Sequence, residues 1–248
     1  MEITTEISDQ ESFDLNCSVS PSENGRRNSC SKSCNASFRS KKLLVAEENR
    51  NPNSEISSTE ISPDLLFKHP LEHCWSLWYY ENNKDKSWEE NQKEVTSFSS
   101  VEDFWCLYNF IKPASQVRTG CDYSIFKKGI RPMWEDKMNE KGGRWIIKFE
   151  YKSRDTEINK YWLDVILLMI GGQFDEFSDE VCGAILNIRN RCDKISIWTP
   201  NINRKNEILG IGRKLKDCLS YVNNINLNYE SHESAEKKTS KNRYLYSL

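Results

Sequence analysis

Large apolar residues recur at alternate positions along several short stretches after residue 67, a pattern typical of β-strands. Residues 71–80 form the first stretch, with bulky side chains on both faces. In residues 144–151 one face is apolar, and it is formed by Trp145, Ile147, Phe149 and Tyr151. Residues 181–190 and 194–199 predict two strands joined by a turn at 191–193, and residues 225–229 predict a closing strand.

Three other stretches have helical spacing instead. Val101 to Ile111 follows a Ser100–Asp103 pair that resembles a capping box, and Pro113 ends the run. Residues 157–170 form an apolar helix that Gly171 and Gly172 stop, and residues 208–222 form a third helix. Strands that follow strands, with helices spread between them, predict an α+β domain with one antiparallel sheet. Helices would cover one face of that sheet and leave the other face open to a ligand.

The first 67 residues differ in composition from the rest of the chain. They contain 14 serines, three aromatic residues, and seven basic against eleven acidic residues, a net charge of −4. Such a segment buries too little apolar surface to offset the entropy lost on ordering. We therefore expect a disordered tail at 1–67 and a folded domain at 68–248.

Charge and cysteine content narrow the class of protein. The whole chain has 35 basic and 37 acidic residues, which argues against binding to nucleic acid by charge alone. Nine cysteines, an odd number without regular spacing, favour a reducing compartment. A run of 18 apolar residues and a secretion signal are both missing. The sequence therefore predicts an intracellular protein that is not attached to a membrane. We expect it in the cytoplasm, with the nucleus as a second location.

The sequence does not indicate an enzyme. It has neither a phosphate-binding GxxxxGK[ST] loop nor a Gly-x-Ser-x-Gly elbow, and only three histidines. His69, His73 and Cys74 lack a fourth ligand at the spacing of a closed metal site. We expect a protein without catalytic residues, cofactor or metal.

Two tryptophans stand in polar surroundings, where a core residue is rare. Trp88 lies within Lys-Ser-Trp-Glu-Glu, and Trp134 is followed by Glu135 and Asp136. An indole stacks on a nucleobase, and a neighbouring carboxylate accepts hydrogen bonds from the Watson–Crick edge of guanine. The alternative is that Trp88 is a half-buried packing residue and that Trp134 anchors a turn.

A group of cations surrounds the turn at 191–193. Strand alternation places Asn187, Arg189 and Arg191 on one side, with Lys194 and Trp198 on the next strand. Three cations close to one turn could hold a phosphate chain. The alternative is an ordinary solvated hairpin. The two groups together would bind a base and its phosphates, which is more specific than either alone.

These residues belong to segments that closely resemble the messenger-RNA cap-binding translation initiation factor 4E family. The resemblance covers about residues 68–248, includes all eight tryptophans, and is carried by His69-Pro-Leu71, Trp75-Ser-Leu-Trp78, Ser87-Trp88, Val101-Glu-Asp-Phe-Trp105, Gly120-Cys-Asp-Tyr123, Pro132-Met-Trp-Glu-Asp136, Gly142-Gly-Arg-Trp145 and Asp193-Lys-Ile-Ser-Ile-Trp198. It implies a curved antiparallel sheet of eight strands with three long helices on its convex face.

The resemblance also implies the ligand, which is the 7-methylguanosine triphosphate cap of messenger RNA. Trp88 and Trp134 would sandwich the base, Glu135 would accept from its Watson–Crick edge, and Trp198 would pack on the N7-methyl group. The implied phosphate-binding residues are Arg189, Arg191 and Lys194, with Arg144 assisting through water. Lys237 and Lys238 would contact RNA beyond the first phosphates, and Lys238 stands where the family has a phosphorylated serine.

A second surface is implied by the same resemblance. It would receive a Tyr-x-x-x-x-Leu-Φ helix from a scaffold initiation factor or from inhibitory binding proteins, through His69, Pro70, Val101, Trp105, Leu163, Asp164, Leu167 and Gly171. For Leu163 and Leu167 the alternative is a plain core role.

The sequence thus predicts a non-enzymatic protein that binds capped messenger RNA and links it to a scaffold, promoting translation initiation. The alternative is a specialised paralogue that binds caps and a repressor protein and silences selected messages. A cap-hydrolysing enzyme would need a Glu-rich metal-binding helix, which the sequence lacks.

Overall fold

The computed structural model describes residues 67–150, 154–221, 225–237 and 244–248, so the predicted tail lies almost entirely outside the described residues. The strands of this part of the chain are β1 (Pro70–Tyr80), β2 (Gln92–Ser100), β3 (Asp122–Lys127), β4 (Gly143–Glu150), β5 (Gly183–Asn187), β6 (Cys192–Thr199), β7 (Asn228–Ser231) and β8 (Tyr246–Ser247). Its helices are α2 (Trp88–Asn91), α3 (Val101–Phe110), α4 (Arg154–Ile170), α5 (Lys205–Cys218) and α6 (His232–Lys237), with 3₁₀ turns η2 (Ala114–Gln116) and η4 (Asp175–Glu180).

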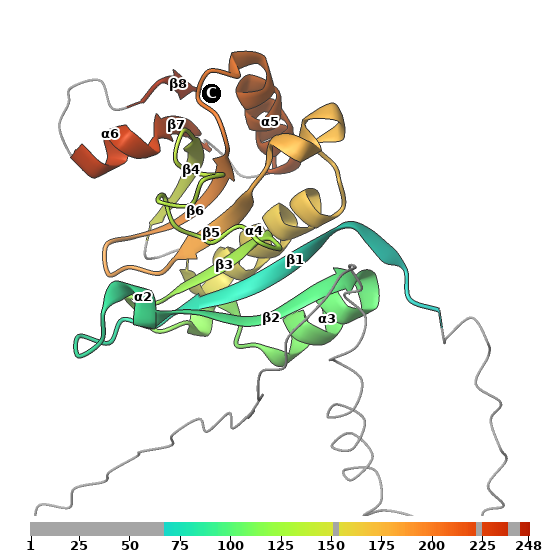
Figure 1. The fold of residues 1–248 in the computed structure, drawn as a ribbon, viewed down its shortest axis with the longest axis vertical. Coiled ribbons are helices and arrows are strands. Elements are labelled where there is room, and N and C mark those ends of the chain that lie inside the picture. Colours follow the sequence, from blue (N-terminus) through green and yellow to red (C-terminus); the bar gives the residue numbers. More distant parts are fainter. Residues whose placement is uncertain (1–66, 151–153, 222–224, 238–243) are drawn as a thin grey trace, which may run out of the picture. The chain divides into compact units, whose positions relative to one another are not determined.

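Across the described ranges, eight strands form one curved sheet in the order β2-β1-β3-β5-β6-β4-β7-β8 (Figure 1). Every neighbouring pair is antiparallel. The predicted fold class, an antiparallel eight-stranded sheet with three long helices on its convex face, is confirmed. A crossover brings β4 between β6 and β7, so strands distant in sequence become neighbours.

The core lies between the sheet and helices α3, α4 and α5. Alternate residues of the strands point to this side, among them Trp75, Leu77, Ile125, Trp145, Ile147, Leu186, Ile195 and Ile197, and each is no more than 2% exposed. Trp145 also donates its indole N–H to the carbonyl oxygen of Ile208 in α5, at 2.8 Å. Because strand side chains alternate between faces, the intervening residues project to the concave face, away from these helices.

A left-handed glycine ends α4, as the sequence predicts. Gly172 has φ +65, its amide donates to the carbonyl oxygen of Met169, and the amide of Gln173 donates to that of Leu168. This pair of bonds is a Schellman motif, which a residue with a Cβ atom adopts only with strain.

The structure shortens one predicted strand and lengthens the next. β5 ends at Asn187 because the Arg189 amide donates to the side chain of Asp193, at 2.8 Å, instead of to a neighbouring strand. The predicted turn at 191–193 was therefore wrong in its bounds, since Cys192 and Asp193 already belong to β6. Ser100 does cap α3 by accepting from the amide of Asp103, while its hydroxyl donates to the Asp103 carboxylate.

Strands β2, β3 and β8 and helices α2 and α6 were not predicted from the pattern. β3 is buried on both faces over Asp122–Phe126, so it shows no alternation of apolar and polar residues. β2 begins with a largely exposed polar stretch, and α6 has only six residues.

Candidate functional site

The concave face carries polar and aromatic residues in rows defined by strand register. One row crosses β1, β3, β5, β6 and β4 and consists of Tyr80, Asp122, Asn187, Lys194 and Lys148. A parallel row, closer to the other end of these strands, contains Phe126, Gly183, Trp198, Arg144 and Glu230. Paired residues on antiparallel strands point to the same face, so these side chains share one surface.

Trp88 is presented by the short connection between β1 and β2. Ser87 accepts from the amide of Glu90 at 3.2 Å, and the Glu90 carboxylate accepts from the amide of Ser87 at 2.7 Å, which completes a capping box. The hydrogen bond from the Ser87 amide is the main reason that the pKa of the Glu90 carboxyl is lowered. Trp88 is 45% exposed, and its ring centroid lies 6.2 Å from that of Tyr80. The Ser-x-x-Glu spacing at 87–90 was a signal that the sequence analysis missed.

Trp134 and Glu135 are presented by the β3–β4 connection. Asp136 accepts from the amides of Arg131 and Met138, each at 3.0 Å, so its carboxylate braces the turn. The fully buried Asn139 donates to the carbonyl oxygens of Arg131 and Met133 at 2.9 and 2.8 Å. The loop is thus fixed from within, while Trp134 remains 38% exposed and Glu135 is exposed.

The two loops begin at opposite ends of the strands. The Trp88 loop follows Tyr80, which pairs with Asp122 at the start of β3, whereas the Trp134 loop follows the end of β3. The structure therefore presents the two predicted base-binding tryptophans on connections that leave the strands at opposite ends.

Trp198 lies in a small apolar cluster on the concave face. It is 5% exposed and packs with Phe126, Cys182 and Ile185. The Phe126 ring stands edge-on to the indole at 5.6 Å between centroids, and the Arg144 guanidinium lies 6.0 Å from its centroid. Trp198 is therefore a fixed part of the floor of the concave face.

Each of two predicted phosphate-binding arginines is held by a buried carboxylate. Arg189 donates to both carboxylate oxygens of Asp122, one at 3.0 Å, and Arg144 donates through Nε and Nη2 to Glu230 at 3.1 and 2.8 Å. Glu230 is fully buried, and burial raises the pKa of the Asp122 carboxyl, against the opposing effect of Arg189. These partners were missed in the sequence because they lie 67 and 86 residues away from their arginines.

The remaining predicted cations lie near this region or outside the described part. Arg191 is exposed at the β5–β6 connection, and Lys194 follows it in β6. Lys237 is the last residue of α6, and Lys238 lies outside the described residues.

The predicted partner surface spans the start of β1 and the helices α3 and α4. His69 bonds Glu102 in the first turn of α3 through Nδ1 at 2.6 Å, and this bond is the main reason that the pKa of Glu102 falls to about 2. Val101 and Trp105 are 38% and 37% exposed. Tyr108 of α3 lies 3.5 Å from the Asn159 carbonyl of α4, so the two helices are adjacent.

On α4, the predicted residues are partly engaged within the fold. Leu163 and Leu167 are partly exposed and also pack on the core, so they contribute to the core and leave part of each side chain at the surface. Asp164 accepts hydrogen bonds from Tyr221 and from Lys160. Gly171 is exposed, directly after α4.

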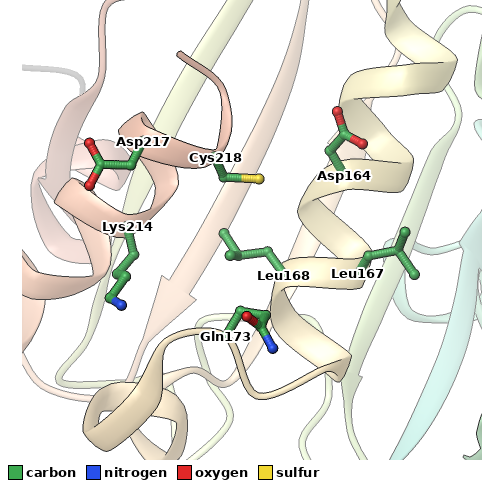
Figure 2. A pocket seen from close by; sticks show the side chains of 7 residues that line it. All are labelled: Asp164, Leu167, Leu168, Gln173, Lys214, Asp217 and Cys218. Carbon is green, nitrogen blue, oxygen red and sulfur yellow. The ribbon is translucent and has the colours of Figure 1, made fainter. Parts of the chain in front are cut away.

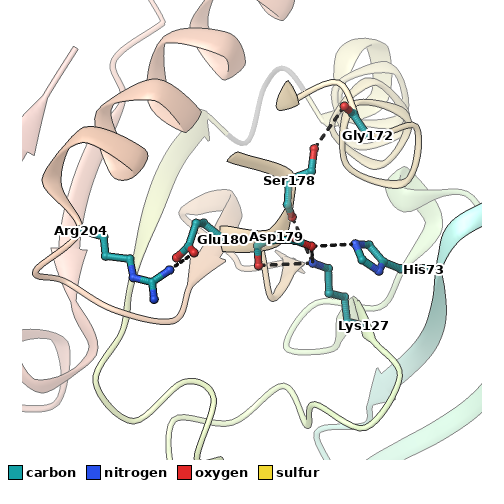
Figure 3. A network of polar contacts seen from close by, with 7 residues as sticks. All are labelled: His73, Lys127, Gly172, Ser178, Asp179, Glu180 and Arg204. Atoms are coloured by element: carbon teal, nitrogen blue, oxygen red, sulfur yellow. Dashed lines mark hydrogen bonds and ion pairs between the residues drawn. The ribbon is translucent and has the colours of Figure 1, made fainter. Parts of the chain in front are cut away.

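A polar network fixes the end of α4 against the sheet (Figure 3). Lys127 of β3 donates to the carbonyl oxygens of Ser178 and Asp179 in η4 at 3.1 and 3.4 Å. The Asp179 carboxylate lies 3.3 Å from His73, and the Ser178 hydroxyl donates to the carbonyl oxygen of Gly172 at 3.2 Å. The turn after Gly171 is therefore tied to β1 and β3.

A groove of about 440 Å³ lies between α4 and α5, beside the predicted partner surface (Figure 2). It shares Asp164 and Leu167 with the predicted partner surface, and its other lining residues are Leu168, Gln173, Lys214, Asp217 and Cys218. The sequence analysis did not identify it, because it is formed by two helices far apart in the chain.

The described residues do not form a cluster of metal ligands. No group of three or more His, Cys, Asp or Glu side chains there could hold a metal ion. His69 instead pairs with Glu102, and His73 with Asp179. Within the same ranges, no helix is both long enough and apolar enough to cross a membrane.

Taken together, these features define an α+β ligand-binding protein with aromatic and cationic side chains on the open face of a curved sheet. The family model described as eukaryotic initiation factor 4E matches residues 70–245. Eukaryotic translation initiation factor 4E1 of Drosophila melanogaster is 51% identical over 189 residues, which cover 76% of this chain and 72% of the relative. The chain belongs to the eukaryotic initiation factor 4E family.

Solved structures agree with that assignment. The crystal structure of Ascaris suum eIF4E-3 with m7G cap has a TM-score of 0.69 and 38% identity, and covers 73% of this chain and 98% of its own. The complex of C. elegans eIF4E-3 with the 4E-binding protein Mextli and cap analog has a TM-score of 0.67 and 40% identity, and covers 73% and 100%. The predictions of a translation initiation factor and of a non-enzymatic protein are confirmed.

Proposed function

We propose that this chain binds the 7-methylguanosine triphosphate cap of messenger RNA on its concave face and links it to a scaffold factor, promoting translation initiation in the cytoplasm. One observation carries the proposal. All eight tryptophans lie in described residues, and those more than a third exposed are Trp88, Trp105 and Trp134. Trp88 and Trp134 are the tryptophans expected to bind the base, and Trp105 is the one expected to bind the partner helix. Tryptophans with a role in the core would be buried instead.

The base would lie between Trp88 and Trp134. Methylation at N7 gives guanine a delocalised positive charge, and electron-rich indole faces attract a cationic ring more than a neutral one. Stacking contributes roughly 1–3 kcal/mol per base, and the cation–π term about 0.5–2 kcal/mol. The exposed Glu135 carboxylate would accept from N1–H and the exocyclic amine, and the Trp134 amide would donate to O6.

The phosphates would meet the cations of the β5–β6 region. Arg189, held in place by Asp122, loses less side-chain entropy on binding than a free arginine. Arg191 and Lys194 would add charge, and Trp198 would contact the N7-methyl group from the floor. Arg144 already bonds Glu230, so it would act through water, as the family resemblance implies.

The scaffold would dock on the helical side. A Tyr-x-x-x-x-Leu-Φ helix presents its apolar residues on one face, which suits the partly exposed Val101, Trp105, Leu163 and Leu167 on adjacent helices. This surface lies on the face of the sheet away from the concave side, so cap and scaffold would not compete for the same residues.

The test is retention of the full chain on 7-methylguanosine resin, with elution by 7-methyl-GTP but not by GTP. Failure of this selectivity would contradict cap binding. Proteins that co-elute from a cell extract identify the partner. A scaffold factor supports promotion of initiation, whereas a repressor without the scaffold supports the silencing paralogue instead.

A further inference from the structure

Lys148 stands opposite another lysine on the concave face. It pairs in register with Lys194 on the neighbouring strand, and Lys194 pairs with Asn187. Strands lie about 4.8 Å apart, and like charges directly opposite each other destabilise a sheet. The two lysines therefore bring positive charge to one point of the concave face.

An aromatic ring lies beside the same ammonium group. Lys148 donates to the hydroxyl of Tyr244 at 2.8 Å, and its Nζ lies 5.4 Å from the centre of the Tyr244 ring. Lys148 is exposed and Tyr244 is partly exposed. A cation next to an accessible aromatic ring is the usual combination for binding single-stranded nucleic acid, because one neutralises the backbone while the other stacks on a base.

The position of this pair connects it to the proposed phosphate-binding residues. The row from Asn187 through Lys194 to Lys148 leads from the β5–β6 region across β6 to β4. Resting on the proposed cap-binding function, we propose that Lys148 and Tyr244 form a subsite for the first transcribed nucleotides. Lys148 binds a phosphate of the RNA that follows the cap, and Tyr244 stacks on one of its bases.

The experiment compares two ligands on the full-length chain: 7-methyl-GTP and a capped five-nucleotide RNA. Tryptophan fluorescence titration gives both affinities. We expect the capped RNA to bind about tenfold more tightly, and Lys148→Gln and Tyr244→Leu each to remove most of that gain, consistent with one stacked base and one phosphate contact. Both variants should bind 7-methyl-GTP within about twofold of the unmodified chain, since the subsite lies beyond the cap.

Conservative variants separate recognition from folding. Lys148→Arg keeps the charge and Tyr244→Phe keeps the ring, so both should retain the gain from the longer RNA. Lys216→Gln removes an exposed lysine from α5, on the helical side, and should change neither affinity. Raising salt should reduce the gain of the unmodified chain, with a log–log slope steeper by about 0.7 than that of Lys148→Gln.

The outcomes distinguish this inference from the proposed function. If the unmodified chain fails to bind 7-methyl-GTP, the cap-binding function itself is wrong. If it binds 7-methyl-GTP but gains nothing from the capped RNA, or if Lys148→Gln keeps the gain, the subsite is wrong. Equal weakening of both ligands by Lys148→Gln also overturns it, because Lys148 would then act on the cap site.

Discussion

The imidazole of His232 lies against the indole of Trp198, with ring centroids 4.0 Å apart and ring planes tilted by 41°. His232 is the first residue of α6 and is 3% exposed. Burial, with a further contribution from the Arg144 charge, lowers its pKa to about 3. A neutral imidazole therefore supports the floor of the concave face, and it couples this floor to pH.

This coupling predicts a loss of stability in acid. In the unfolded chain His232 binds a proton as pH falls below about 6.5, whereas the folded chain resists protonation down to about 3. Its contribution is thus complete above pH 6.5, and the free energy of unfolding falls by about 1.4 kcal/mol per pH unit below it. Urea unfolding at pH 7.5 and 5 should show about 2 kcal/mol of this loss.

The His232→Phe variant isolates the effect, since it removes the titrating group and keeps a ring against Trp198. The stability difference between the unmodified chain and His232→Phe should shift by about 2 kcal/mol between the two pH values. Parallel pH profiles for the two proteins would show that His232 does not resist protonation.

The exposed tryptophans predict the main loss in ligand affinity. Trp134→Ala should weaken binding of 7-methyl-GTP by about 2–4 kcal/mol, because it removes stacking and cation–π terms together. Trp88→Ala should have a similar effect. Trp105→Ala, which changes an equally exposed indole on α3, serves as the matched control and should leave this titration unchanged. Unaltered affinity in Trp134→Ala would contradict the sandwich.

Salt should separate the base-binding residues from the phosphate-binding ones. Glu135→Ala should weaken 7-methyl-GTP binding at high and low salt alike, because its hydrogen bonds lie against a stacked base. The effect of Arg191→Ala should shrink as salt rises, since exposed charges are screened. Titrations at several salt concentrations measure both, and identical salt dependence would refute this division of roles.

Arg189 needs a different substitution. Arg189→Ala would leave the nearly buried Asp122 without the guanidinium that it binds, so loss of stability would mix with loss of affinity. Arg189→Lys keeps the charge and removes the paired hydrogen bonds. Its effect on affinity should be smaller than that of Arg189→Ala, and thermal unfolding reports how much of either effect is structural.

Trp105 should matter for the partner and not for the cap. Trp105→Ala should weaken binding of a Tyr-x-x-x-x-Leu-Φ peptide by about 2 kcal/mol or more, as expected for a tryptophan at the centre of an interface. Phe110→Ala is the control, since Phe110 is 73% exposed at the end of the same helix. Fluorescence anisotropy of a labelled peptide measures both. Equal losses in the two variants would point to a general effect on α3.

Much of the fold follows from local pattern. The alternation at 144–151 and the helical spacing before Gly171–Gly172 predict β4 and α4 because burial on one face requires apolar residues at a fixed period. β3 could not be predicted in this way, because burial on both faces removes the alternation of apolar and polar residues. The polar neighbours of Trp88 and Trp134 also predicted exposed indoles, because a core would have buried those charges as well.

The partners of the site residues depend on tertiary structure. Arg189 contacts Asp122 because β3 and β5 are neighbours in the sheet. Arg144 contacts Glu230 because β4 pairs with β7. The packing of His232 on Trp198 arises in the same way. Sequence periodicity fixes which face a side chain points to, but strand order and register fix which distant side chain stands next to it. The sequence by itself therefore determined the residue types and faces of the site, and the assembled sheet decided how each of them is held.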